Sequence, residues 1–148
     1  MIKEHPYLGV GYFNFAPYFG LHHPDELLYG SAQLPHNIFI QVGTDAGALG
    51  LLVYVTLIWR GFASTRAVRR HLKHDKEHWL YKLSYGYDAT FFGFLIAGQF
   101  VTIGYYPFMW IHLAFVTATE NIVATTMKPA RPGTGQPAAA LVGRRASS

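Results

Sequence analysis

The sequence contains no cysteine among its 148 residues. Disulfides, catalytic thiolates and zinc sites built on thiolates are therefore excluded. Charged residues are also scarce: they make up 14% of the chain, whereas about 25% is usual in soluble domains. The start, MIKEHPYLGVGYFNF, lacks the basic stretch followed by an apolar stretch that marks a signal peptide. Apolar residues are abundant, at 51%, and their distribution indicates the fold class.

The segment from Ile38 to Trp59 is almost free of charge, and Asp45 is its one charged residue. A helix of this length spans about 33 Å, close to the hydrocarbon thickness of a bilayer. We therefore predict a membrane protein whose first spanning helix covers about residues 36–59.

A second apolar stretch extends from about residue 83 to residue 124, close to twice the length of one span. It is interrupted by GYYP at 104–107, where glycine weakens a helix and Pro107 cannot continue one. Two more helices are expected, at about 83–104 and 106–126. The predicted fold class is thus all-α, with three membrane-spanning helices in residues 36–126.

The segments between and beside these helices differ in charge. Residues 60–82 carry seven Lys or Arg residues against Asp75 and Glu77, and the tail at 127–148 adds further arginines. A basic patch can indicate nucleic acid, but between two apolar spans it is typical of a cytoplasmic loop. We therefore predict no nucleic-acid partner, a cytoplasmic loop at 60–82 and a disordered cytoplasmic tail at 127–148. Residues 1–35 then form a periplasmic loop, with a short helix near 25–29, at the inner membrane of a bacterium.

Several polar residues fall at membrane depth, where a charge costs at least about 2.5–3.5 kcal/mol near the centre. They are Asp45, Asp88, Gln99, His112 and Glu120. The chain has few cations at that depth to pair with them. We therefore expect further helices upstream in a longer protein, with Met1 as an internal methionine.

The segment LPHNIFIQVGTDAGALG, residues 34–50, places polar residues at the start of the first span. On a helix that begins near His36, three glycines share one face with His36 and Ile40: Gly43, Gly47 and Gly50. Such a stripe lets a second helix approach closely in lipid, so we predict a helix–helix contact there. The neighbouring face is polar and is expected to face protein or water. It consists of Asn37, Gln41, Thr44, Asp45 and Ala48.

His36 is thereby predicted at the outer edge of the membrane, beside the polar face. The residues alone leave two interpretations open, a solvated side chain or a functional one. Asn37 is expected to cap the helix or to orient the imidazole. HHPDE at 22–26 and HLKHDKEH at 71–78 are better explained as solvated surfaces than as metal sites, so no metal ligand is predicted.

The spacing His36-Asn37, nine residues, then Gly47-x-x-Gly50 resembles the late periplasmic edge of the O-antigen ligase and polymerase superfamily. An upstream segment, HPYLGVGYFNF, resembles the P-x-x-G-x-G-x-x-x-F segment of the same family. Its matching residues are Pro6, Gly9, Gly11 and Phe15. GQFVTIGYYPFMW is similar to O-glycosylation ligases associated with exosortase systems. The two main matches cover roughly residues 5–60.

This resemblance implies a glycosyltransferase that moves a glycan from undecaprenyl diphosphate to an acceptor outside the inner membrane, without a metal or cofactor. His36 matches the family's functional histidine, which would accept the acceptor hydroxyl's proton or hydrogen-bond the leaving diphosphate. Asn37, Gln41 and Asp45 are expected to bind substrate. The family's diphosphate-binding arginines belong to earlier segments, so the chain alone is expected to be inactive.

Three alternatives stay open. An O-antigen polymerase and a protein O-oligosaccharyltransferase belong to the same chemical class and differ in glycan and acceptor. A small, non-enzymatic membrane subunit built from the same three helices belongs to a different class.

Overall fold

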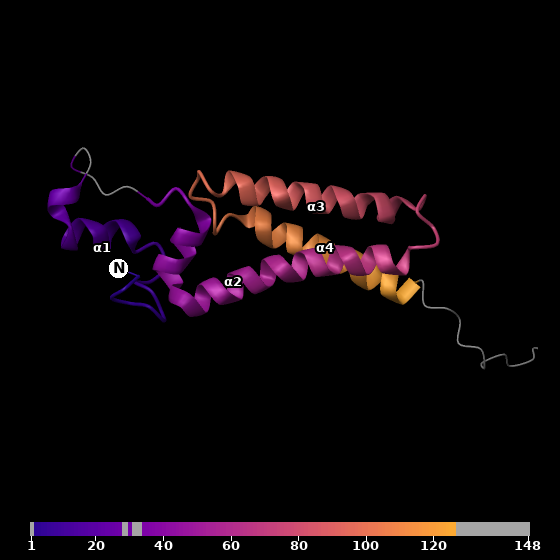
Figure 1. Ribbon diagram of the computed structural model, residues 1–148, viewed down its shortest axis with the longest axis horizontal. Coiled ribbons are helices and arrows are strands. Elements are labelled where there is room, and N and C mark those ends of the chain that lie inside the picture. Colours follow the sequence, from indigo (N-terminus) through magenta and orange to yellow (C-terminus); the bar gives the residue numbers. More distant parts are fainter. Residues whose placement is uncertain (1, 28–29, 31–33, 127–148) are drawn as a thin grey trace, which may run out of the picture.

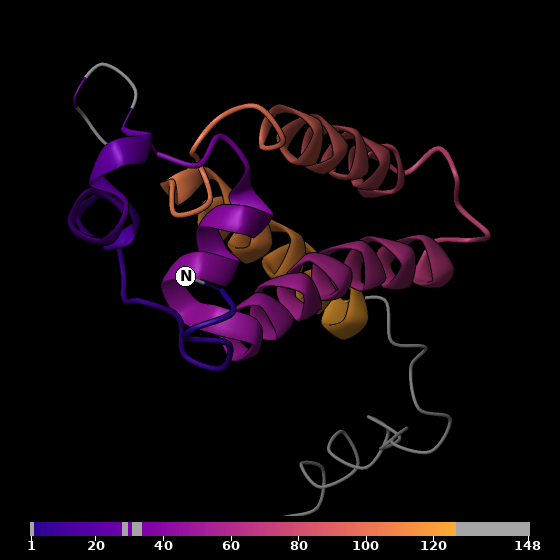
Figure 2. The same cartoon turned by 60° about the vertical axis from the view of Figure 1, so that its left-hand side comes forward.

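A computed structural model describes residues 2–27, 30 and 34–126 of the chain. These residues form helices and no strand, which confirms the all-α class. The helices are α1 (Phe15–His22), the 3-10 helix η1 (Pro24–Glu26), α2 (Ile38–His71), α3 (Trp79–Ala97) and α4 (Pro107–Thr126). The last three lie side by side as a bundle, and α1 lies beyond one end of it (Figures 1 and 2).

The N-terminal region holds more helix than the sequence predicts. Only a short helix near 25–29 is expected there, but α1 precedes it and η1 begins at Pro24. Pro17 is accommodated because it lies in the first turn of α1, where its missing N–H has no helical partner. Residues 28 and 29 lie outside the described residues, as does the tail at 127–148 for which disorder is predicted.

Helix α2 continues past its predicted end at Trp59 to His71, so most of the predicted loop at 60–82 is corrected to helix. The connection to α3 is limited to residues 72–78. The helix continues because its last turns have a buried apolar side. Val68 and Leu72 are almost fully buried and form a cluster with Leu80 of α3 and Val123 of α4.

Helix α4 begins and ends close to its predicted positions, whereas α3 begins about four residues and ends about seven residues before the predicted 83–104. His78 starts α3 earlier than predicted, because its Nδ1 accepts a hydrogen bond from the Leu80 amide at 3.2 Å. Helix α3 ends at Ala97, and residues 98–106 cross to α4. Pro107 occupies the first position of α4, as the GYYP sequence predicts.

Helix α2 is sharply bent at Gly47, whose φ of 66° and ψ of −167° are not helical. Glycine adopts such a conformation without the steric penalty that a Cβ would introduce. The bend leaves amides of the following turn without helical acceptors, and the N-terminal segment supplies replacements. The Ala48 amide donates to the Pro6 carbonyl at 2.8 Å, and the Leu49 amide donates to the Tyr7 carbonyl at 3.3 Å.

Carbonyl groups before the bend are satisfied by the same N-terminal segment. The Val10 amide donates to the Thr44 carbonyl at 2.8 Å, and the Gly11 amide donates to the Asp45 carbonyl at 2.9 Å. Gly9, at φ 69°, lies directly against these two carbonyls and has no room for a side chain. Residues 6–11 therefore replace the hydrogen bonds that the bend interrupts, and we name them the N-terminal strap.

The predicted glycine stripe is wrong as a helix–helix contact. A Cβ at Gly47 would collide with the Tyr7 backbone of the strap rather than with another helix. A Cβ at Gly43 would meet only Leu51 of the same helix, at 3.7 Å, and one at Gly50 would meet Ala46. The prediction fails because the bend interrupts the helical periodicity on which the common face depended.

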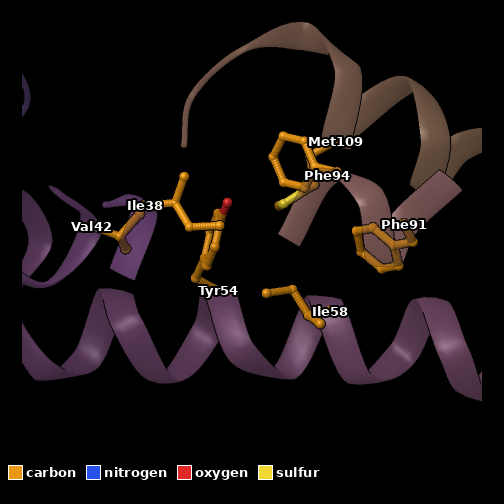
Figure 3. Packing of buried hydrophobic residues seen from close by; sticks show 7 residues of the cluster. All are labelled: Ile38, Val42, Tyr54, Ile58, Phe91, Phe94 and Met109. Carbon is orange, nitrogen blue, oxygen red and sulfur yellow. The ribbon is translucent and has the colours of Figure 1, made fainter. Parts of the chain in front are cut away.

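The larger hydrophobic cluster fills the inside of the bend (Figure 3). Two of its residues, Ile38 and Val42, precede the bend, while Tyr54 and Ile58 follow it. Helices α3 and α4 complete the cluster with Phe91, Phe94 and Met109. The short first part of α2 is thus held against the three-helix bundle by side-chain packing as well as by the strap.

Most polar residues predicted at membrane depth have partners within the chain. Asp88 lies 2.9 Å from the Arg69 guanidinium and accepts a hydrogen bond from the Thr65 hydroxyl at 2.6 Å. Glu120 lies 3.8 Å from Arg60. His112 is buried, and its Nε2 has no hydrogen-bond partner among the described residues.

Of the described helices, only α2 is long and apolar enough to cross a membrane. Helices α3 and α4 have 19 and 20 residues, but their polar residues lower the mean hydropathy. Length and composition therefore support one of the three predicted spans.

Replacing Gly47 by alanine is expected to destabilise the fold, because a Cβ meets both an unfavourable φ and the Tyr7 backbone. The positive φ alone costs about 1–2 kcal/mol. Gly86→Ala is the matched control, since a Cβ at that helical position meets nothing within 4 Å. Thermal unfolding in detergent should show Gly47→Ala melting several degrees below the parent, with Gly86→Ala at or above it. Equal melting temperatures for Gly47→Ala and the parent would contradict the role of Gly47 in forming the bend.

Candidate functional site

His36 lies exposed at the bent end of the bundle, directly before α2. Its backbone is fixed on both sides. The Thr102 hydroxyl donates to the Pro35 carbonyl at 2.7 Å, and the Ile38 amide donates to the Gly98 carbonyl at 2.8 Å. The imidazole is therefore attached to a backbone that the 98–106 connection holds in place.

Asn37 caps α2, as the sequence predicts. Its Oδ1 accepts hydrogen bonds from the Phe39 amide at 2.9 Å and the Ile40 amide at 3.1 Å. Its Nδ2 donates to Gln99 Oε1 at 2.8 Å. One side chain thus starts the helix and ties it to the 98–106 connection next to His36.

Gln41 and Asp45, predicted to bind substrate, lie in the interior with 3% of their surface exposed. Gln41 Oε1 accepts a hydrogen bond from the Gly104 amide at 3.0 Å. Asp45 Oδ2 accepts one from the Phe13 amide at 3.2 Å. Both side chains bind the backbone of the chain itself, and the polar face faces protein, one of the two environments expected for it. Their role in substrate binding stays a prediction.

The second oxygen of Asp45, Oδ1, is buried and has no hydrogen-bond partner among the described residues. Tyr105 lies beside this carboxylate. Burial raises the pKa of Tyr105, and the Asp45 carboxylate raises it further. Tyr105 therefore stays a neutral phenol, and its ring packs edge-on against Tyr12 at 4.8 Å between centroids.

The predicted site residues divide into two groups. Asn37, Gln41 and Asp45 connect α2 to the 98–106 connection and to the segment after the strap, whereas His36 stays at the surface. The His36 side chain makes no hydrogen bond or ion pair with another residue in the described part of the chain. A solvated imidazole can accept a proton or, once protonated, donate two hydrogen bonds.

The structure also contains features that the sequence reasoning missed. The bend at Gly47 and the N-terminal strap that pairs with it were not predicted. The sequence signal that could have indicated them is the pair Gly9 and Gly11, in the segment singled out only for its family resemblance. In the structure both glycines adopt a positive φ. No cluster of three or more metal-ligating side chains occurs among residues 2–27, 30 and 34–126.

Comparisons of the chain with family models, with curated proteins and with solved structures found no match. The resemblance to the O-antigen ligase superfamily depends on the residues named above and stays a prediction.

Replacing Asn37 by alanine is expected to cost about 1–2 kcal/mol of stability, because two helical amides lose their acceptor. Gln99 also loses its donor. Asn37→Asp is the matched control, since its carboxylate still accepts from both amides. Chemical unfolding should rank the parent first, then Asn37→Asp, then Asn37→Ala. If the alanine variant were as stable as the parent, the cap would have no energetic role.

Proposed function

We propose that this chain is the membrane-embedded part of a glycosyltransferase of the O-antigen ligase type, which transfers a glycan from undecaprenyl diphosphate. The observation that carries the proposal is the contact between the two segments on which the family resemblance depends. Gly9 lies against the carbonyls of Thr44 and Asp45, and Gly47 lies against Tyr7. The spaced glycines of both segments therefore serve one structural purpose, which favours a common origin over two chance matches.

His36 is the residue that would handle the proton in this reaction. The acceptor hydroxyl loses its proton as its oxygen attacks the sugar carbon, and the diphosphate leaves. An imidazole accepts a proton near neutral pH, and as imidazolium it hydrogen-bonds a phosphate oxygen. We favour the base role, because His36 is exposed to an incoming hydroxyl and its backbone is held by Pro35 and Ile38.

We further propose that α3 and α4 cross the membrane together with α2. Large apolar side chains are exposed on all three helices, which suits contact with lipid tails or with further helices. On α2 they include Leu49, Leu52, Val53, Val55 and Trp59; on α3, Phe92 and Ile96; on α4, Phe108, Trp110, Ile111, Phe115 and Ile122. The bend lies at one end of the bundle, and the connection at 72–78 lies at the other end, directly after the arginines Arg66, Arg69 and Arg70 of α2 (Figure 1). The positive-inside rule then assigns the connection to the cytoplasm and His36 to the periplasm.

A transferase of this type must also bind the diphosphate. We propose that cationic groups for this purpose come from helices outside this chain, which would cover part of the exposed apolar surface. The polymerase and the protein O-oligosaccharyltransferase require the same proton acceptor, so both remain proposals of the same class.

One observation favours the non-enzymatic alternative. Gln41 and Asp45 are engaged by the backbone of Gly104 and Phe13, so the polar face is occupied by the chain itself. Under this alternative the chain would support a partner in the membrane, and His36 would be a solvated residue.

Substitution of His36 in the cell that produces the protein separates these functions. His36→Ala is expected to lower glycan transfer about 10²–10⁴-fold, the usual effect of losing a proton acceptor. His36→Gln keeps a hydrogen-bond donor but takes up no proton, so a base role predicts a similar loss. The measurement is the amount of glycan attached to the acceptor in isolated membranes, normalised to the amount of inserted protein.

His74→Gln is the matched control, because His74 lies in the connection at the far end of the bundle. It should transfer glycan at the parental rate. Loss in the alanine variant with retention in the glutamine variant would assign His36 to diphosphate binding. Parental transfer in both variants would favour the non-enzymatic alternative.

A further inference from the structure

The second half of α2 presents one face that is largely exposed in the part of the chain that the structure describes. Its residues recur at steps of three and four and so share a side of the helix. The face consists of Thr56, Trp59, Arg60, Ala63, Arg66, Ala67, Arg70 and His71, and we name it the arginine stripe. The opposite side, with Gly61, Ser64, Thr65 and Val68, is buried.

Two hollows lie along the arginine stripe. The first has a volume of 370 Å³ and is lined by Thr56, Trp59, Arg60 and Ala63. The second has a volume of 340 Å³ and is lined by Ala67, Arg70 and His71. Each hollow therefore combines small side chains, which leave space, with an arginine at its wall.

The charge of the stripe has one sign. Beyond Asp45, α2 carries no carboxylate. Arg69 lies next to the stripe and is engaged by Asp88, and Arg60 lies near Glu120. Arg66 and Arg70 are exposed, and neither forms an ion pair with any residue that the structure describes. The two arginines are therefore available to an anion from outside.

The helix face continues from the stripe into exposed apolar residues. Leu52 and Val55 precede the first hollow by one turn, and Trp59 is 57% exposed between them and the arginines. Tryptophan is favoured at the boundary between lipid tails and head groups. Apolar side chains, then a tryptophan, then arginines match the order of tail, glycerol and phosphate in a phospholipid.

We propose that the arginine stripe binds an anionic phospholipid, with the phosphate at Arg66 and Arg70 and an acyl chain along Val55 and Leu52. An acidic protein helix would complement the charge but not the apolar residues beyond Trp59, so the lipid is the favoured occupant. The proposal rests on the membrane placement of α2 and is independent of glycan transfer. A variant at His36 should leave lipid binding unchanged.

The test uses Trp59 as a reporter in the full chain, with Trp79 and Trp110 replaced by phenylalanine. The protein is reconstituted into phosphatidylcholine vesicles that contain the same mole fraction of either brominated phosphatidylglycerol or brominated phosphatidylcholine. Bromine quenches tryptophan fluorescence at close contact. The anionic brominated lipid should quench Trp59 more strongly, and Arg66→Gln with Arg70→Gln should reduce this preference by roughly fivefold for each arginine.

The matched control is Lys3→Gln with Lys82→Gln, which removes the same charge away from the stripe and should retain the preference. Equal quenching by both lipids in the parent would overturn the proposal, as would an unchanged preference in the double arginine variant. If that variant does not fold, salt provides the second test in the parent. Rising NaCl should bring the preference towards one, because ions screen the exposed arginines, and a preference insensitive to salt would also overturn the proposal.

Discussion

The bend at Gly47 depends on backbone hydrogen bonds that come from a distant part of the chain. A broken helix leaves amides and carbonyls unpaired, and in a membrane or a protein interior an unpaired group costs several kcal/mol. The strap provides two carbonyls to Ala48 and Leu49 and two amides to Thr44 and Asp45. The bent helix and the folded N-terminal segment are therefore stable only together.

This dependence fixes the end of the bundle at which His36 lies. The bend directs the first part of α2 across the bundle (Figure 2). There Asn37 donates to Gln99, and Gln41 accepts from the Gly104 amide. The 98–106 connection is thus held by the residues that follow His36. A helix that continued straight through Gly47 would carry these groups away from the connection. The position of His36, the candidate catalytic residue, is consequently a result of the hydrogen bonds between the N-terminal strap and the bend at Gly47.

Much of the helical content was predictable, whereas the bend was not. Charge scarcity and periodicity predicted helices in the right order, and Pro107 and Asn37 marked two helix starts correctly. Gly47 was interpreted as a packing residue because local spacing cannot show whether glycine offers a small surface or a positive φ. Its φ is decided by residues 6–11, some forty positions away in the sequence. The extension of α2 beyond Trp59 was missed for a similar reason, since Val68 and Leu72 are buried by Leu80 and Val123.

Amide hydrogen exchange at Ala48 and Leu49 tests the hydrogen bonding between the N-terminal strap and the bend most directly. The account predicts that both amides are protected to the same degree as those in the following turns of α2, because Pro6 and Tyr7 accept their hydrogen bonds. Gly9→Ala, which forces the strap away from Thr44 and Asp45, should remove that protection while leaving the later turns protected. Rapid exchange of Ala48 and Leu49 in the parent chain, beside protected neighbours, would contradict the account.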